Sequence, residues 1–280
     1  MARLTRMFWF LALIFPAELA VGADLAEGVL TATGAGIADG SRYPTPTQAK
    51  LLSRRAAMVD AQRNLLETIN GVRITGGTTV ENMMVTSDKV GSRVQGMIRG
   101  AFIVSENSYE DAGNWVTELE LGICVNGTPE SCKGKATLTQ AVQDELPVPA
   151  PEAVYAPAPE DVPATLAAPG EAATGLIVDV SAFDFSPMLD VRIRTTEGQE
   201  LYGPGIAQPE TGDWLNWART VASARDMGDI VGAAPLLVDA AELGDDGHIV
   251  VSNENAMEIF MQNTQGGNFL KQGKVVFVVR

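Results

Sequence analysis

Residues 45–71, TPTQAKLLSRRAAMVDAQRNLLETING, predict one long helix that decides the fold of the first half of the chain. Thr45 is a typical capping residue, Pro46 suits the first helical position, and Gln48 completes a capping box. Gly71 predicts the end of the helix. The sequence therefore predicts a helix from about residue 46 to residue 70.

This helix carries a broad apolar stripe suited to packing across a sheet. The predicted core face comprises Leu52, Ala56, Val59 and Leu66, with Leu51, Met58, Leu65 and Ile69 beside it. A basic face lies on the same helix, formed by Lys50, Arg54, Arg55 and Arg63. We expect this face to be solvated, and the alternative is a docking surface for an acidic partner.

Alternating residues near position 120 predict the sheet. Trp115, Thr117, Leu119, Leu121 and Ile123 alternate with Val116, Glu118, Glu120 and Gly122. Period two of this kind predicts an antiparallel sheet with one wet face. Residues 28–34 predict another strand, and the glycines at 34, 36 and 40 then predict a turn or bulge, because their spacing does not fit a dinucleotide-binding loop.

Four segments divide the chain. Residues 1–23 read as a signal peptide, with a cationic start, a short apolar run and Val21-Gly22-Ala23 as the cleavage site. Residues 24–143 form the first α+β domain, and residues 175–280 form a second, smaller α+β domain. Residues 144–174 are rich in proline, alanine and acids and predict an extended, self-repelling linker.

Export predicts a periplasmic protein with cleavage near Ala23 and no membrane helix after that point. The alternatives are a periplasmic protein associated with the outer membrane and an uncleaved anchor. An oxidising compartment favours a disulfide between Cys124 and Cys132, which flank a turn-rich stretch, over two free thiols.

Composition excludes several classes of function. The chain has 20 Lys and Arg against 35 Asp and Glu, a net charge of −15, which argues against a nucleic-acid binder. Two cysteines and one histidine leave too few ligands for a multi-Cys zinc site, an iron–sulfur cluster or a multi-His metal site. We therefore predict no metal, no cofactor and no catalytic residues.

Two further candidates occur in the second domain. Trp214 and Trp217 begin a predicted helix over residues 214–225 and form either part of the core, which we favour, or an aromatic platform for a ligand such as a glycan. His248 follows Asp245-Asp246-Gly247 and is expected to be a solvated turn residue; the alternative is a general base.

Two stretches resemble known families. Residues 53–73 fit the pattern A-R/K-x-A-A-x-x-D-A-x-R-N-L-x-E-x-I-x-G-V, through Arg55, Ala57, Asp60, Ala61, Arg63, Asn64, Leu65, Glu67, Ile69, Gly71 and Val72. This pattern resembles the LPP20 lipoprotein family, which includes the N-terminal region of flagellar assembly protein T and the flagellar outer-membrane lipoprotein P. The chain differs from the lipoprotein members in lacking a lipobox cysteine.

The second half resembles a module that accompanies this domain in some bacterial envelope proteins. The matching pieces are residues 174–179, Ser186-Pro187, Glu197-Gly198, residues 201–203, 234–236, 251–256 and 269–271. Together the resemblances imply a non-enzymatic structural or assembly role in the envelope or flagellar base, through protein–protein contacts and often as oligomers. The alternative is a periplasmic ligand- or glycan-binding module.

Overall fold

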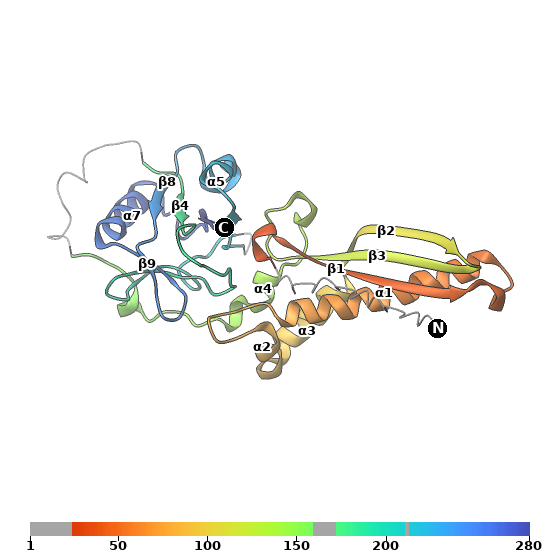
Figure 1. The fold of residues 1–280 in the computed structure, drawn as a ribbon. Helices are drawn as coiled ribbons and strands as arrows, with labels where there is room; N and C mark the ends of the chain where they lie inside the picture. The colour runs from red at the N-terminus through yellow and green to blue at the C-terminus, as the bar shows by residue number, and fades with distance from the viewer. Residues whose placement is uncertain (1–23, 159–171, 211–212) are drawn as a thin grey trace, which may run out of the picture.

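A computed structural model of the protein describes residues 24–158, 172–210 and 213–280. Figure 1 shows an elongated lobe from the first domain, extending from a rounder lobe, the body, built by the second domain. We define the arm as β1 (Val29–Asp39), α1 (Pro46–Asn70), β2 (Phe102–Asp111) and β3 (Asn114–Cys124). The predicted signal peptide, residues 1–23, lies outside the described residues.

Three α-helices lie where the arm approaches the body (Figure 1): α2 (Val80–Thr86), α3 (Asp88–Arg99) and α4 (Leu138–Val142). The 3-10 turn η2 (Gly40–Arg42) lies at the opposite end, at the tip of the arm, where the Gly40 N–H donates to the Gly113 carbonyl. The other 3-10 turns are η1 (Leu25–Glu27), η3 (Glu130–Cys132), η4 (Gln143–Glu145) and η5 (Pro151–Ala153).

The arm is a helix packed on a three-stranded antiparallel sheet of order β1-β3-β2. β1 and β3 pair along their whole lengths, from Val29 opposite Cys124 to Asp39 opposite Asn114. α1 covers one face of the sheet (Figure 1). This confirms the predicted fold class, a long helix on an antiparallel sheet within an α+β protein.

The two ends of α1 are those that its capping residues predict. The Thr45 side chain accepts a hydrogen bond from the Gln48 N–H, and Pro46 is the first helical residue. Gly71 caps the other end, with its N–H bonded to the carbonyls of Glu67 and Ile69.

The predicted apolar stripe of α1 is confirmed in part: Leu65 and Ile69 are buried and Met58 and Leu66 pack against the core, whereas Leu51, Leu52 and Val59 are exposed. The residues that the helix buries recur every four positions: Ala49, Ser53, Ala57, Ala61, Leu65 and Ile69. Of the predicted face, Val59 is 66% exposed, and the neighbouring Leu51 is 57% exposed. The helix therefore packs through its small side chains, because these allow its backbone to approach the sheet closely.

Glycines on β1 make this close approach possible. A Cβ at Gly36 would lie 2.0 Å from the Ser53 carbonyl oxygen, and one at Gly34 would lie 2.2 Å from the Ala61 nitrogen. The prediction of a turn or bulge from residue 34 is therefore wrong, since β1 continues to Asp39. These glycines are needed for space rather than for an unusual backbone conformation.

The body contains two four-stranded sheets and three helices within the described residues. Its strands are β4 (Leu176–Asp179), β5 (Ile193–Thr195), β6 (Glu200–Tyr202), β7 (Trp217–Ala218), β8 (Leu236–Asp239), β9 (Glu242–Leu243), β10 (Ile249–Val251) and β11 (Val275–Val278). Its helices are α5 (Val221–Asp226), α6 (Gly228–Val231) and α7 (Asn253–Gln265).

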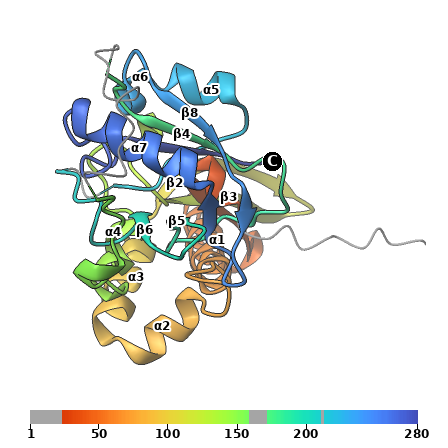
Figure 2. The same cartoon turned by 90° about the vertical axis from the view of Figure 1, so that its left-hand side faces the viewer.

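One sheet of the body, of order β7-β11-β4-β8, is entirely parallel and is covered on both faces. Ile177, Val276 and Val278 pack with residues of α5 and α6 on one face. Figure 2 shows α5 and α6 on one side of β4 and β8, and α7 on the other. The second sheet, of order β6-β5-β10-β9, is mixed.

The predicted helix over residues 214–225 is shorter than expected. Trp217 lies in β7, and α5 begins only at Val221, after a capping box between Thr220 and Ser223. The short strand pairs with β11 at Phe277, and this contact over a long sequence separation overrides the local helical pattern.

The predicted linker differs from an extended tether over its first half. Leu146 is buried, the Pro147 carbonyl accepts a hydrogen bond from Arg192, and the Tyr155 N–H donates to the Glu200 carbonyl. Apolar and backbone groups in residues 144–158 thus attach this half to the body despite its proline and acid content. Residues 159–171 lie outside the described residues.

The two lobes share one apolar core. Ile74, Leu138 and Val142 of the first domain belong to the same buried cluster as Leu189 and Leu215 of the body. The lobes are therefore packed directly against each other as well as connected in sequence.

Candidate functional site

A loop closed by a disulfide joins the arm to the body. Cys124 and Cys132 are bonded, with an S–S distance of 2.05 Å, which confirms the predicted pairing. Between them, Asn126 Nδ2 donates to the Leu215 carbonyl at 2.9 Å, and Thr128 Oγ1 donates to Asn216 Oδ1 at 2.8 Å. The loop therefore holds hydrogen-bonding groups of the first domain against the body.

Replacing both cysteines with alanine should lower the free energy of unfolding by about 2–3 kcal/mol, since the short loop is then unconstrained in the unfolded chain. Urea unfolding of the oxidised protein and of the double variant measures the difference. The variant measured with and without reductant is the control, because it has no disulfide to lose. An unchanged midpoint on removing the disulfide would contradict the expectation.

Asp213 is a half-buried carboxylate at the same junction. It accepts a hydrogen bond from the Thr137 hydroxyl of the first domain at 2.9 Å. Burial raises the pKa of Asp213, while hydrogen bonds from Thr137 and from the Gly127 N–H act in the opposite direction. The hydrogen bond from Thr137 therefore links the two lobes.

A buried ionic cluster forms the second part of the junction. Arg192 donates to Asp190 at 2.8 Å, to both carboxylate oxygens of Glu200 at 2.8 and 2.9 Å, and to the Pro147 carbonyl. Burial alone would lower the pKa of Arg192, but the hydrogen bonds and charges of the two carboxylates raise it overall. The Asp190 N–H in turn donates to the Ile74 carbonyl of the first domain at 2.8 Å.

Three segments that are distant in sequence therefore meet at Arg192: the loop after α1, the start of the linker segment and the second sheet of the body. Its guanidinium is saturated by protein partners, so the cluster is an internal clamp rather than a free anion-binding site.

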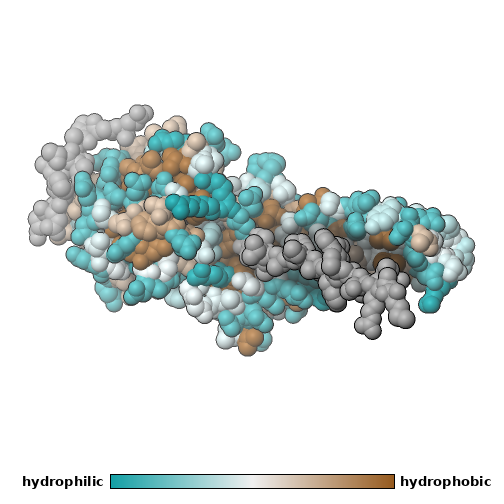
Figure 3. Space-filling model, viewed as in Figure 1, coloured by the Kyte–Doolittle hydropathy of each residue, from teal (hydrophilic) through white to brown (hydrophobic). Residues whose placement is uncertain are grey.

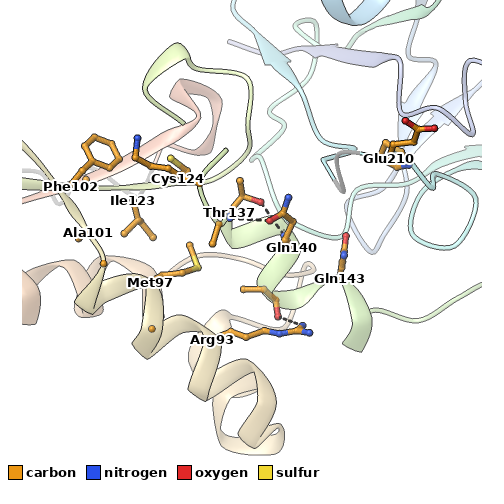
Figure 4. Close-up of a pocket in the computed structure, with 17 residues that line it drawn as sticks. Arg93, Met97, Ala101, Phe102, Ile123, Cys124, Thr137, Gln140, Gln143 and Glu210 are labelled. Atoms are coloured by element: carbon orange, nitrogen blue, oxygen red, sulfur yellow. Dashed lines mark hydrogen bonds between the residues drawn. The ribbon is translucent and has the colours of Figure 1, made fainter. Parts of the chain in front are cut away.

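A groove of about 940 Å³ opens between α3, the end of β3 and α4, with Pro209 and Glu210 of the body on its edge. Figure 4 shows Met97, Ile123 and Thr137 pointing toward one another from three elements, with Glu210 on the far side. Its cations are engaged: Arg93 pairs with Asp144 at 2.8 Å, and Lys135 lies over the Phe102 ring. The groove is partly apolar, and the Thr137 hydroxyl in its lining is hydrogen-bonded to Asp213.

Both candidate tryptophans are in the core. Trp214 is 3% exposed and Trp217 is 5% exposed. Trp217 packs against the rings of Phe185 and Phe277, and Trp214 packs against Tyr202. Neither ring faces solvent, so the aromatic platform has no accessible surface.

His248 is buried, and the prediction of a solvated turn residue is wrong. Its Nε2 lies 3.7 Å from Asp246 Oδ2, and its Nδ1 has no hydrogen-bond partner among the described residues. Neighbouring strands cover the ring, which a reading of the local Asp-Asp-Gly turn does not anticipate. Burial lowers the pKa of His248 below its usual 6.5, although the charge of Asp246 acts in the opposite direction.

Acid should therefore destabilise the fold through His248. Between its folded and unfolded pKa values the unfolded chain binds more protons, so the free energy of unfolding falls as pH decreases below about 6.5. Urea unfolding at pH 7.5 and pH 5.5 should show a smaller pH dependence in His248→Gln than in the wild type. Identical pH dependences in the two proteins would contradict this role.

Three of the four cations on the basic face of α1 have a partner within the protein. Arg54 pairs with Glu106 of β2 at 2.8 Å, Arg63 pairs with Asp60 of the same helix at 2.6 Å, and Lys50 lies over the Trp115 ring. Arg55 is exposed and has no partner among the described residues, and Lys50 and Arg63 are exposed as well. Arg55 is therefore the cation of this face that remains unpaired among the described residues.

Two residues of the family pattern block one edge of the sheet, a role that the sequence analysis missed. Asp60 Oδ2 accepts a hydrogen bond from the Ala35 N–H at 3.1 Å, and Asn64 Nδ2 donates to the Thr33 carbonyl at 2.8 Å. These backbone groups lie on the free edge of β1, where another strand would otherwise pair. The four-residue spacing of Asp60 and Asn64 on a helix was the available signal.

Metal ligation and membrane spanning find no support in the parts of the chain that the structure describes. No group of three or more acidic, histidine or cysteine side chains is placed to hold a metal ion there. The helices in those ranges also fall short of the length and apolarity required to cross a bilayer.

Comparison with known families agrees with this architecture. Residues 27–122 match the model of the LPP20 lipoprotein family, and residues 175–280 match the second domain of Treponema pallidum Tp0624. No curated protein matches the chain. The boundaries of the first match enclose the arm almost completely, and those of the second enclose the body. The chain thus contains a region similar to the LPP20 lipoprotein family, which suggests a protein of the cell envelope, followed by a region similar to the second domain of Tp0624.

Proposed function

We propose that this protein is a non-enzymatic structural or assembly protein of the periplasm, which acts through contacts with envelope or flagellar-base proteins or with copies of itself. The LPP20 match supports an envelope role. The ionic cluster, in which protein groups saturate the Arg192 guanidinium, supports a structural role for these charges.

The observation that carries this proposal is the distribution of exposed hydrophobic residues. Seven of the ten large hydrophobic residues that are exposed in the described chain lie on the arm: Ile37, Leu51, Leu52, Val59, Ile103, Val104 and Tyr109. Figure 3 shows brown hydrophobic residues among teal ones along this lobe. Exposed apolar surface concentrated on one lobe is typical of a protein-binding surface.

Photo-crosslinking in the native host tests this function. A photoreactive residue at Leu51 or Ile37 should crosslink to envelope proteins or to the protein itself. The same residue at Val148, which is exposed but lies outside the arm, is the control. The proposal fails if the arm positions give no specific crosslinks, and the identified partners separate a flagellar role from a general envelope role.

Ligand binding is a second candidate function. Its site would be the groove between α3, β3 and α4, because both tryptophans are buried. The volume of this groove falls within the usual range for ligand sites. Met97→Trp would narrow it, so any thermal stabilisation by muropeptides or phospholipids should decrease in that variant. Stabilisation that is absent from the wild type, or unchanged in the variant, would exclude this candidate.

A further inference from the structure

The outer face of the arm's sheet has an ordered pattern of side chains. Ile37, Val116 and Tyr109 lie directly opposite one another across the three strands and form an apolar row near the tip. Two acidic rows follow toward the body, one containing Glu118 and the next containing Glu120. A groove of about 550 Å³ is lined in part by these two glutamates.

The solvent side of α1 has a complementary pattern. Leu51, Leu52 and Val59 are exposed there, and Arg55 lies between them. We call these four residues the ridge. Apolar groups of this size, repeated along one helix face without a partner inside the chain, indicate that the face contacts another surface.

Charge separates the two sides of the arm. Residues 29–39 and 102–124, which form the strands, contain six acidic residues and no Lys or Arg. α1 contains four basic residues, Lys50, Arg54, Arg55 and Arg63, against Asp60 and Glu67. In a contact between two sheet faces, Glu118 and Glu120 of one copy would face the glutamates of the other copy. In a contact between two ridges, Arg55 of one copy would face Arg55 of the other. A ridge against a sheet face brings opposite charges together.

We propose that copies of this chain stack arm on arm, with the ridge of one copy seated on the outer sheet face of the next. This inference rests on the proposed function and names the partner as a second copy. Leu51 and Leu52 pack on the Ile37–Val116–Tyr109 row, and Arg55 meets Glu118.

The spacing along the two surfaces fits this arrangement. Leu51 and Arg55 are four residues apart, which spans about 6 Å along a helix. The apolar row and the Glu118 row are two residues apart along a strand, which spans about 7 Å. The apolar contacts and the contact between Arg55 and Glu118 can therefore form in the same arrangement of the two copies.

Such a contact joins two different surfaces of the same chain. A stack keeps a free ridge at one end and a free sheet face at the other. Further copies therefore add until the stack closes into a ring. The association should therefore produce species larger than a dimer as the concentration rises.

Sedimentation velocity of the exported full-length protein tests the proposal by charge exchange. Arg55→Glu and Glu118→Lys should each weaken self-association at least about tenfold, because each places like charges together. The double variant should restore it to within about threefold of the wild type. Arg225→Glu, an equal charge change on exposed α5 of the body, is the control and should have no effect.

Circular dichroism of each variant separates misfolding from weakened association, and rescue in the double variant is not expected from two independent folding defects. A wild type that remains monomeric at all concentrations overturns the stacking, as does a double variant without rescue. The proposed function would then still stand if arm positions crosslink to other envelope proteins. It fails separately if those positions crosslink to nothing.

Discussion

Replacing Arg192 with methionine should lower the free energy of unfolding by about 3–5 kcal/mol, the usual effect of removing one partner from a buried ion pair. The substitution leaves Asp190 buried without a cation, leaves Glu200 paired only with the partly exposed Arg194 at 3.2 Å, and removes the donor to the Pro147 carbonyl. The Asp190 carboxylate then requires protonation or exposure to water. Because Asp190 also bonds to Ile74, we expect the contact between the lobes to weaken as well.

Urea unfolding measures this effect, and the exposed pair between Arg54 and Glu106 provides a matched control. Arg54→Met removes a cation of the same type from a solvated site, where such pairs contribute roughly 1 kcal/mol or less. Equal losses in the two variants would show that the buried cluster has no special role in stability.

The second large effect is expected at Gly36. Gly36→Ala should lower the free energy of unfolding by about 3 kcal/mol, because the added methyl meets backbone atoms that cannot rotate away. It would lie 2.0 Å from the Ser53 carbonyl oxygen and 2.4 Å from the Ala57 nitrogen. The helix must then move off the sheet along much of the arm.

Gly96→Ala is the control of opposite sign. Gly96 lies inside α3, and a Cβ there would meet nothing within 4 Å. Alanine favours a helix interior over glycine by roughly 0.5–1 kcal/mol, so this variant should be slightly more stable than the wild type. Thermal unfolding of the two variants, one destabilised and one stabilised, isolates the close approach of α1 to β1 as the cause.

The parts of the fold that depend on neighbouring residues could be predicted from the sequence. The ends of α1 follow from Thr45, Pro46 and Gly71, which act within one turn of the helix. The pairing of Cys124 with Cys132 depends on a short loop. Alternation around Leu119 correctly identified the antiparallel sheet, because that sheet has one exposed face.

The parts that depend on distant residues could not. Which face of α1 is buried is decided by the glycines of β1, and apolar size alone selected Leu52 and Val59 instead of Ala57 and Ala61. Trp217 is drawn into a strand by Phe277, sixty residues away in the sequence. His248 and Arg192 are buried by segments that no local pattern connects to them.

The blocked edge of β1 also limits how this sheet can grow. Within the described chain, Asp60 and Asn64 occupy the β1 edge, while β2 forms the other border without a neighbouring strand. Fibrillar aggregation through endless strand addition needs two receptive borders on every molecule. Two molecules that joined through their β2 edges would each keep only the blocked β1 edge free. Strand addition would therefore stop at a dimer instead of continuing into amyloid.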